Sequence, residues 1–150
     1  MDELDQFILR ILQEDGRTPF TEMARESGVS ETTIRTRYRN LIEAGIVRTV
    51  GIVDPRALGF QAPAIIAVSV EPGATERVAR SMAELPEVSY LVMTLGSYDL
   101  IIEVFCRDQQ HLADLITRQM HLMPGVRSTE TLVIARSYKL TYRHATGLGI

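Results

Sequence analysis

Apolar and polar residues in the first third of the chain alternate with the spacing of short helices. The first apolar stripe consists of Leu4, Phe7, Ile8, Ile11 and Leu12, which fall at helical intervals. Asp15-Gly16 ends this stripe, and Thr18-Pro19 predicts the N-cap and first residue of a second helix. Gly28 closes the second helix.

A third helix is predicted from Ser30, a residue that can cap it, to Gly45. Its expected buried positions are Ile34, Tyr38, Leu41 and Ile42. Ala24 and Gly28 lie four residues apart, as in a helix-turn-helix, where a small residue allows close crossing and glycine supplies a positive φ. We therefore predict a helix-turn-helix DNA-binding domain over residues 1–47.

The exposed face of the third helix is cationic. Between Arg35 and Arg48 there are four arginines and one acid, Glu43. Arginine neutralises phosphate or makes a bidentate contact to guanine, and threonine reaches phosphates or thymine methyl groups. The predicted DNA contacts are Ser30, Thr32, Thr33, Arg35, Thr36, Arg37 and Arg39. The alternative is a helical bundle whose arginines form only a solvated face.

The next stretch is predicted to be a β-containing hinge over residues 48–63. Residues 47–53 are rich in β-branched side chains and predict a strand, which Asp54-Pro55 and Gly59 interrupt. Such a strand is either a wing that contacts DNA or an arm that pairs with another subunit, and the sequence leaves both open.

Residues 64–150 contain an internal repeat that predicts a second domain. Val78, Met82, Leu85, Pro86 and Val88 match Ile116, Met120, Met123, Pro124 and Val126 at an offset of 38 residues. Each half has a helix that leads into a strand, preceded by apolar strands at 64–70 and 98–106, and Asp108 can cap the second helix. The fold class is thus α+β, and the second domain is a ferredoxin-like βαββαβ unit.

The predicted strands are apolar on both faces, although two helices can cover only one face of a four-stranded sheet. Ile66 and Ile102 alternate with Ile65 and Ile101, where a one-sided sheet would alternate with polar residues. An uncovered apolar face is an interface or an aggregation hazard, so we expect a homodimer joined through these faces. Ile102 is expected to lie on the uncovered face.

Composition narrows the function classes. The formal charge of -3 argues against a protein that coats nucleic acid non-specifically. The acidic N-terminus and the absence of an apolar run of roughly 20 residues predict a cytoplasmic protein without membrane contact. Cys106 is expected to be a buried thiol, and His111, His121 and His144 lack metal-ligand spacing, so no metal and no cofactor are expected.

Several motifs together resemble the Lrp/AsnC (leucine-responsive, feast/famine) family of transcriptional regulators. They are Leu4-Asp5 to Ile8-Leu9, Leu12 to Arg17, Gly28-Val29-Ser30, Arg37 with Leu41 to Gly45, Gly96-Ser97-Tyr98-Asp99 and Pro124-Gly125-Val126. The resemblance covers essentially the whole chain. It implies a winged helix-turn-helix, a β hinge and a ligand-sensing domain, in homodimers that often form octamers and bind amino acids between subunits.

The resemblance also implies an effector site around the turn at 96–99. The expected contacts are Gly96, Ser97, Tyr98, Asp99, Thr129 and Thr131. The Gly96 N–H can meet a carboxylate and Asp99 can accept from an α-ammonium group. The family's turn usually reads Gly-Asp-Tyr-Asp, so Ser97 removes one negative charge and favours a neutral amino acid over lysine. The alternative is that this turn is purely structural.

These features predict a sequence-specific, nucleoid-associated regulator that binds an inverted repeat in double-stranded DNA and responds to a small molecule. A nucleoid-organising architectural protein without an effector is the alternative. An enzyme is not expected, because no nucleophile or oxyanion site accompanies Asp99 and Glu103. An RNA-binding module is not expected either, because the strands lack the aromatic-rich signature.

Overall fold

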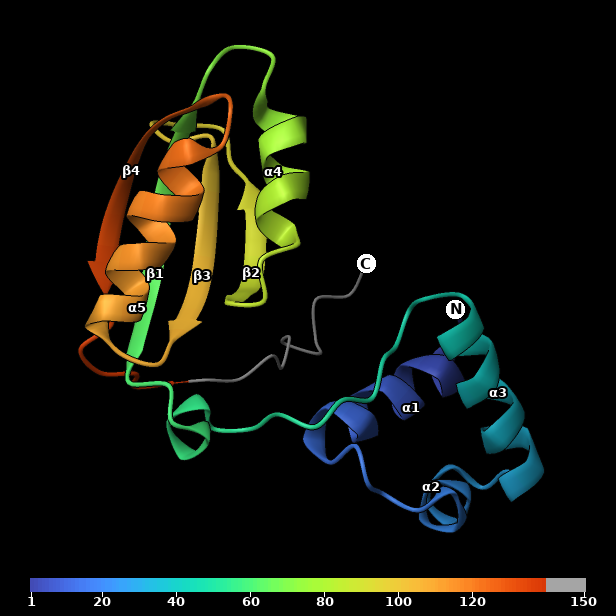
Figure 1. Ribbon diagram of the computed structural model, residues 1–150. Helices are drawn as coiled ribbons and strands as arrows, with labels where there is room; N and C mark the ends of the chain where they lie inside the picture. The colour runs from blue at the N-terminus through green and yellow to red at the C-terminus, as the bar shows by residue number, and fades with distance from the viewer. Residues whose placement is uncertain (140–150) are drawn as a thin grey trace. The chain divides into compact units, whose positions relative to one another are not determined.

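The computed structural model describes residues 1–139, which form two compact units (Figure 1). Residues 1–52 make up the N-terminal unit and residues 53–138 the C-terminal unit. The division falls inside the stretch predicted as the hinge.

The N-terminal unit contains α1 (Glu3–Glu14), α2 (Phe20–Ser27) and α3 (Glu31–Glu43). Their shared core is built from Ile8, Met23, Ala24, Ile34 and Leu41. Ile42 was expected in this core, but its side chain is 43% exposed. At about 100° per residue, Ile42 lies about 80° around the helix from Ile34, whereas Leu41 lies within about 20° of it.

The turn between α2 and α3 forms as predicted. Gly28 has φ 72° and ends α2, and the Ser30 side chain accepts a hydrogen bond from the Thr33 N–H. The start of α2 differs from the prediction, because its N-cap is Pro19, which makes no side-chain capping bond. The Thr18 hydroxyl instead donates to the Asp15 carbonyl at 2.9 Å and closes the turn after α1.

The strand predicted over residues 47–53 does not form in the single chain. Residues 47–54 belong to no helix or strand. Val47 packs against the N-terminal core, and Asp54 caps the short helix η1 (Pro55–Leu58). A strand needs a neighbouring strand to accept its backbone hydrogen bonds, and no described residue of this chain pairs with this segment. The predicted β hinge is therefore an irregular connection here.

The C-terminal unit has the predicted ferredoxin-like order. Its elements are β1 (Ala62–Val70), α4 (Thr75–Ala83), β2 (Val88–Met93), β3 (Leu100–Cys106), α5 (Gln109–Asp114), which continues as η2 (Leu115–Gln119) and η3 (Met120–Leu122), and β4 (Val126–Val133). The four strands form an antiparallel sheet in the order β2-β3-β1-β4. Strand β1 begins at Ala62 rather than at residue 64, because Ala62 pairs with Cys106 and the Pro63 carbonyl accepts from the Ile134 N–H.

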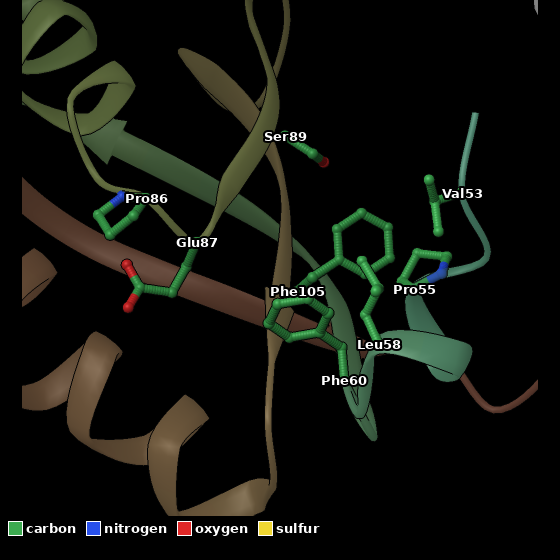
Figure 2. Close-up of a pocket in the computed structure, with 8 residues that line it drawn as sticks. All are labelled: Val53, Pro55, Leu58, Phe60, Pro86, Glu87, Ser89 and Phe105. Atoms are coloured by element: carbon green, nitrogen blue, oxygen red, sulfur yellow. The ribbon is translucent and has the colours of Figure 1, made fainter. Parts of the chain in front are cut away.

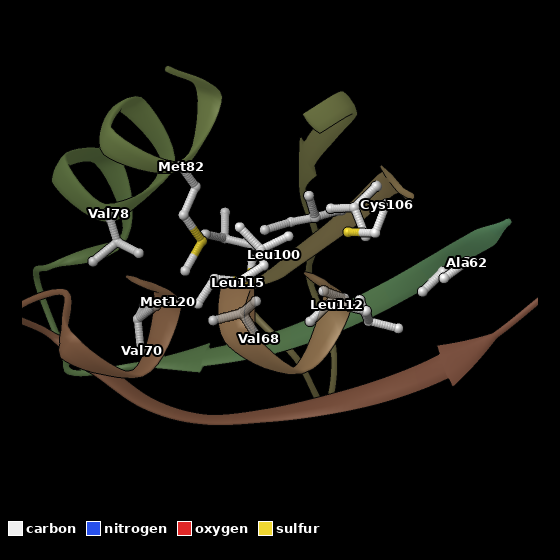
Figure 3. Close-up of a cluster of buried hydrophobic side chains, with 14 of the residues drawn as sticks. Ala62, Val68, Val70, Val78, Met82, Leu100, Cys106, Leu112, Leu115 and Met120 are labelled. Carbon is white, nitrogen blue, oxygen red and sulfur yellow. The ribbon is translucent and has the colours of Figure 1, made fainter. Parts of the chain in front are cut away.

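Helices α4 and α5 cover one face of this sheet (Figure 1). Figure 3 shows Val78 and Met82 of α4 and Leu112 and Leu115 of the second helix packed on that face. Ile102 belongs to this core and is completely buried, so the expectation that it lies on the uncovered face is wrong. The sequence held a signal that was missed, because every position of β1 and β3 under the helices is apolar, whereas Ser69 and Glu103 lie on the other face.

The other face of the sheet, called the open face below, is covered by neither α4 nor α5, although the short helix η1 and Phe60 lie beside Phe105 near the end of β3. The strand register places Ile65, Val92, Ile101, Phe105 and Leu132 among its apolar residues, with the acids Glu103 and Glu130 on the same face. Leu132 is exposed and the other four are partly buried. The predicted second apolar face therefore exists, with Ile101 rather than Ile102 at its centre.

Candidate nucleic-acid interface and effector turn

The predicted DNA-contacting residues in and before α3 divide into three groups by their contacts, and Arg37 forms a group of its own. Thr32, Arg35, Thr36 and Arg39 are exposed. Ser30 and Thr33 are used by the helix itself, because the Ser30 Oγ accepts from the Thr33 N–H at 3.1 Å and lies 2.8 Å from the Thr33 Oγ1. The exposed group shares one side of the helix, as residues four apart do.

Arg35 and Arg39 each pair with an acid one turn away on α3. The Arg35 guanidinium lies 2.5 Å from the Glu31 carboxylate and also stands over the Phe20 ring, 5.1 Å from its centroid. Arg39 lies 3.9 Å from Glu43. The side chains of Arg35 and Arg39 are 62% and 67% exposed, so both remain accessible to a phosphate or a base.

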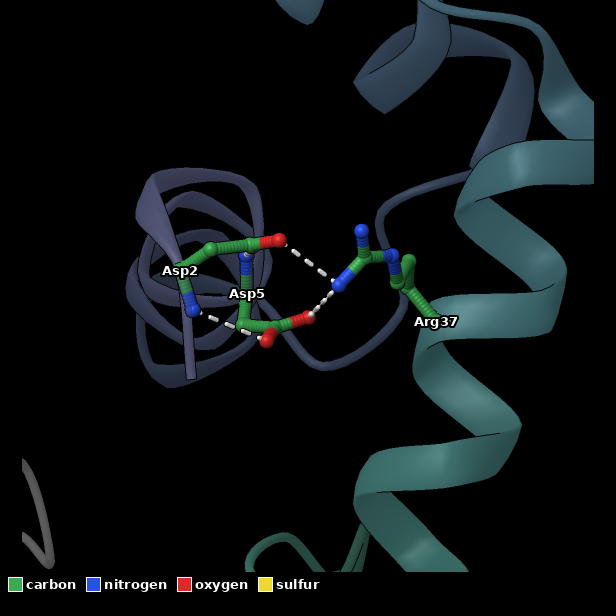
Figure 4. A network of polar contacts seen from close by, with 3 residues as sticks. All are labelled: Asp2, Asp5 and Arg37. Atoms are coloured by element: carbon green, nitrogen blue, oxygen red, sulfur yellow. Dashed lines mark hydrogen bonds and ion pairs between the residues drawn. The ribbon is translucent and has the colours of Figure 1, made fainter.

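Arg37 has a different environment, because it faces α1 (Figure 4). Its Nη1 lies 2.7 Å from Asp2 and 3.4 Å from Asp5, whose side chain is only 11% exposed. The Asp5 N–H, and then the Arg37 guanidinium, hold the pKa of the Asp2 carboxyl below its usual value. Arg37 thus links α3 to the start of α1, a role that the sequence analysis did not predict.

Phe20 and Tyr38 also support this surface and were missed as functional residues. Their rings lie 5.1 Å apart, and the Tyr38 hydroxyl is 3.0 Å from the Thr49 hydroxyl. The Phe20 ring therefore contacts both the Arg35 guanidinium and the Tyr38 ring. Tyr38 in turn contacts Thr49 in the segment that follows α3. An aromatic residue at the first position of α2 was the available signal in the sequence.

The predicted effector turn joins β2 to β3. Gly96 and Ser97 are exposed, and a Cβ atom at Gly96 would meet no atom of another part of the chain within 4 Å. Asp99 is engaged within the chain, because its carboxylate accepts from the Val70 N–H at 2.8 Å and its own N–H donates to the Val68 carbonyl. These bonds fasten the turn to the end of β1, so Asp99 has a structural role whether or not it binds a ligand.

The remaining predicted effector residues lie on opposite faces of the sheet. The Tyr98 hydroxyl donates to the Glu130 carboxylate, which raises the pKa of Tyr98. Thr129 and Thr131 pair with Val68 and Ile66, whose side chains lie under the helices. The Thr129 hydroxyl is 2.8 Å from the His121 Nε2. The single chain therefore does not gather the six residues into one pocket.

A shallow apolar pocket lies elsewhere in the C-terminal unit (Figure 2). It is lined by Val53, Pro55, Leu58, Phe60, Pro86, Glu87, Ser89 and Phe105. The Glu87 carboxylate points away from the Phe105 ring and lies 2.9 Å from the His111 Nε2. Since the His111 Nδ1 accepts from the Arg107 N–H, Nε2 donates to Glu87. None of the predicted effector residues lines this pocket.

Cys106 is buried beneath the helices, as predicted. Burial, followed by the charges of Glu87 and Asp108, raises the pKa of its thiol to about 11. Among residues 1–139, no group of three or more histidine, cysteine or acidic side chains could hold a metal ion. His144, named in the sequence analysis, lies outside the described residues. No helix in the described part of the chain is long and apolar enough to span a membrane.

Comparison with known families matches both units. Residues 1–42 match the AsnC-type helix-turn-helix domain, and residues 63–143 match the Lrp/AsnC ligand binding domain. An HTH-type transcriptional regulator of Pyrococcus abyssi is 38% identical over 143 residues, which are 95% of this chain and 90% of the relative.

Solved structures agree with these matches. AsnC of E. coli is 28% identical with a TM-score of 0.85, over 97% of this chain and 98% of that one. A transcriptional regulator of Neisseria meningitidis, solved as a complex with L-Met, is 26% identical with a TM-score of 0.85, over 95% of this chain and 94% of that one.

Proposed function

Because this chain belongs to the Lrp/AsnC family of transcriptional regulators, we propose that it binds a specific inverted repeat in double-stranded DNA as a homodimer or a larger assembly. Its DNA binding is proposed to respond to a small neutral amino acid. It would act where the DNA is, on the nucleoid in the cytoplasm. The relatives are named as regulators and not as enzymes.

The observation that carries the DNA-binding proposal is the exposed side of α3. Arg35 and Arg39 project from this side, one turn apart, and Thr32 and Thr36 are exposed beside them. In helix-turn-helix proteins the second helix of the motif enters the major groove, where arginine contacts guanine in a bidentate manner. Arg35 and Arg39 are therefore the proposed base-reading residues, and Ser30, Thr33 and Arg37 the residues that hold the helix in place.

Alanine substitutions test this assignment. We expect Arg35→Ala and Arg39→Ala each to weaken binding to the preferred DNA site by about 1–3 kcal/mol, because each removes a base contact. Fluorescence anisotropy on that site and on an unrelated duplex measures the effect. An equal loss on both duplexes, with a shallower salt dependence, would assign the arginines to phosphates. A double variant that binds like the unchanged protein would contradict the assignment.

The effector proposal rests on the match to the ligand binding domain and on the L-Met complex of the Neisseria relative. We propose that Gly96, Ser97, Tyr98 and Asp99 contact the ligand at a subunit junction, where a second copy completes the site. Thr129 and Thr131 are proposed to contribute from the same or the neighbouring copy. The match to a ligand binding domain favours this sensor over an architectural protein without an effector.

Ser97→Asp tests the charge argument at the effector turn. This substitution restores the acid that the family usually has, so we expect the variant to gain affinity for lysine of about tenfold relative to methionine. Calorimetry with methionine, leucine and lysine measures the change, and Ser97→Asn is the neutral control. An unchanged preference in Ser97→Asp would remove Ser97 from the site. If no amino acid binds the unchanged protein, the amino-acid proposal fails.

A further inference from the structure

The two exposed arginines of α3 are held by their own chain to different degrees. Glu31 lies 2.5 Å from Arg35, whereas Glu43 lies 3.9 Å from Arg39. Arg35 is also supported by the Phe20 ring, which lies 5.1 Å below the guanidinium. A carboxylate and an aromatic ring from two helices therefore fix the Arg35 side chain, while Arg39 has one loose partner.

Glu31 lies at a position where its negative charge would repel the phosphates of bound DNA. It is the first residue of α3, directly after the cap Ser30. In a helix-turn-helix, the residues at this end of the second helix contact the base edges, close to the phosphates. An acid at the helix N-terminus interacts favourably with the helix dipole, but it repels phosphate, and in the major groove it can accept only from an exocyclic amino group such as that of cytosine. Glu31 thus lowers the affinity for DNA in general.

The Glu31–Arg35 pair contributes little to folding. The Glu31 side chain is 42% exposed and the Arg35 side chain 62% exposed, and exposed pairs of this kind add little to stability. The pair formed by Arg37 and Asp5 contrasts with it, because Asp5 is nearly buried. The close contact between Glu31 and Arg35 is therefore better explained by the orientation of the arginine than by the stability of the helix.

We propose that Glu31 is a positioning residue that sets DNA sequence discrimination. It holds the Arg35 guanidinium in the orientation needed for a bidentate contact with guanine, and it penalises complexes in which Arg35 contacts only phosphates. Specificity is the difference between the affinities for the preferred site and for unrelated DNA. A residue that weakens the complex with unrelated DNA more than the complex with the preferred site therefore raises specificity. This inference rests on the proposed role of Arg35 in reading DNA.

Glu31→Gln and Glu43→Gln form a matched pair of tests, because each removes one negative charge from α3. Binding of the full chain is measured by anisotropy on a duplex selected from a random pool and on an unrelated duplex of equal length, at several salt concentrations. We expect Glu31→Gln to bind the unrelated duplex about threefold more tightly or better, since a nearby repulsion is removed. Its discrimination between the two duplexes should fall about fivefold. Glu43→Gln should strengthen binding to both duplexes by the same factor.

Two further variants separate the outcomes. Glu31→Asp keeps the negative charge but has a shorter side chain. Its affinity for the unrelated duplex should therefore stay as low as that of the unchanged protein, while its discrimination between the two duplexes should fall. Equal effects of Glu31→Gln and Glu43→Gln on both duplexes, with Arg35→Ala impaired, would overturn the role of Glu31 alone. If Arg35→Ala discriminates between the two duplexes as well as the unchanged protein does, Arg35 does not read bases. The proposed role of Glu31 would then fail with it.

Discussion

Three arginines on one helix show how the same charge takes different roles at the residue scale. Arg35 and Arg39 form ion pairs with acids of α3 itself, while Arg37 reaches two carboxylates at the start of α1. The helical pattern placed all three on or near the polar face, and it placed Arg37 at the border. It could not identify Asp2 and Asp5 as partners, because they lie more than 30 residues away in the chain.

Replacement of Arg37 by alanine should affect folding more than DNA reading. The substitution leaves the nearly buried Asp5 carboxylate without its guanidinium, so we expect a loss of about 1 kcal/mol in the free energy of unfolding, a value reduced because Arg37 is partly exposed. Urea unfolding followed by circular dichroism measures this loss. Arg35→Ala is the control and should unfold like the unchanged protein. A loss of DNA discrimination in Arg37→Ala without a loss of stability would contradict this role.

The effector turn illustrates a second limit at this scale. Its motif identified Gly96 to Asp99 as a unit, and the structure places these residues in one turn between β2 and β3. The hydrogen bond from Val70 to Asp99 was not predictable, because it depends on how the turn meets β1. Thr129 and Thr131 were predicted from analogy alone, and the register of β4 places them with Val68 and Ile66 on the helix side.

At the scale of elements, the sequence predicted what depends on local spacing. The three N-terminal helices and the βαββαβ order follow from apolar intervals, caps and glycines within short stretches, and the structure confirms them. The strand at 47–53 failed because β-branched composition favours an extended backbone but does not supply a partner strand. Ile102 was assigned to the wrong face because both faces are largely apolar, and the polar Ser69 and Glu103, which mark the face away from the helices, were not weighed.

The segment 47–53 should become a strand when a second copy supplies the neighbour. Val50, Ile52 and Val53 are exposed in the single chain and have the composition of a strand. We expect their amides to be protected from hydrogen exchange at concentrations at which the protein is dimeric, without DNA. Mass spectrometry over a dilution series measures this protection. Protection that appears only after addition of DNA would assign the segment to a wing on the DNA instead.

At the scale of the whole molecule, the open face predicts association. Ile65, Ile101 and Phe105 lie around Glu103 on the face that α4 and α5 leave uncovered, and exposed apolar side chains gathered on one face are typical of an interface. A symmetric contact of this face with itself would double the helix-turn-helix and match an inverted repeat. Such a dimer would link the sheet to the proposed inverted repeat in the DNA site.

Ile101→Asp should separate the subunits. The substitution places an unpaired charge in the centre of the open face, so the dimer would have to bury it at a cost of several kcal/mol. Sedimentation velocity should show a shift toward monomer. The variant should also bind the inverted repeat more weakly than the unchanged protein does. Leu122→Asp is the matched control, because Leu122 is 71% exposed on the helix side, and this variant should remain at least dimeric. A dimeric Ile101→Asp would contradict the proposed interface.

The division of the chain between residues 52 and 53 has a practical meaning for protein engineering. The buried residues of the first core lie between Ile8 and Leu41, and those of the second between Ala62 and Met120. A gene fusion at this junction would transplant each half with its core complete. On the proposed function, the first 52 residues, grafted onto the ligand binding domain of a relative, would make a hybrid that reports that domain's ligand through the DNA sites proposed for this protein.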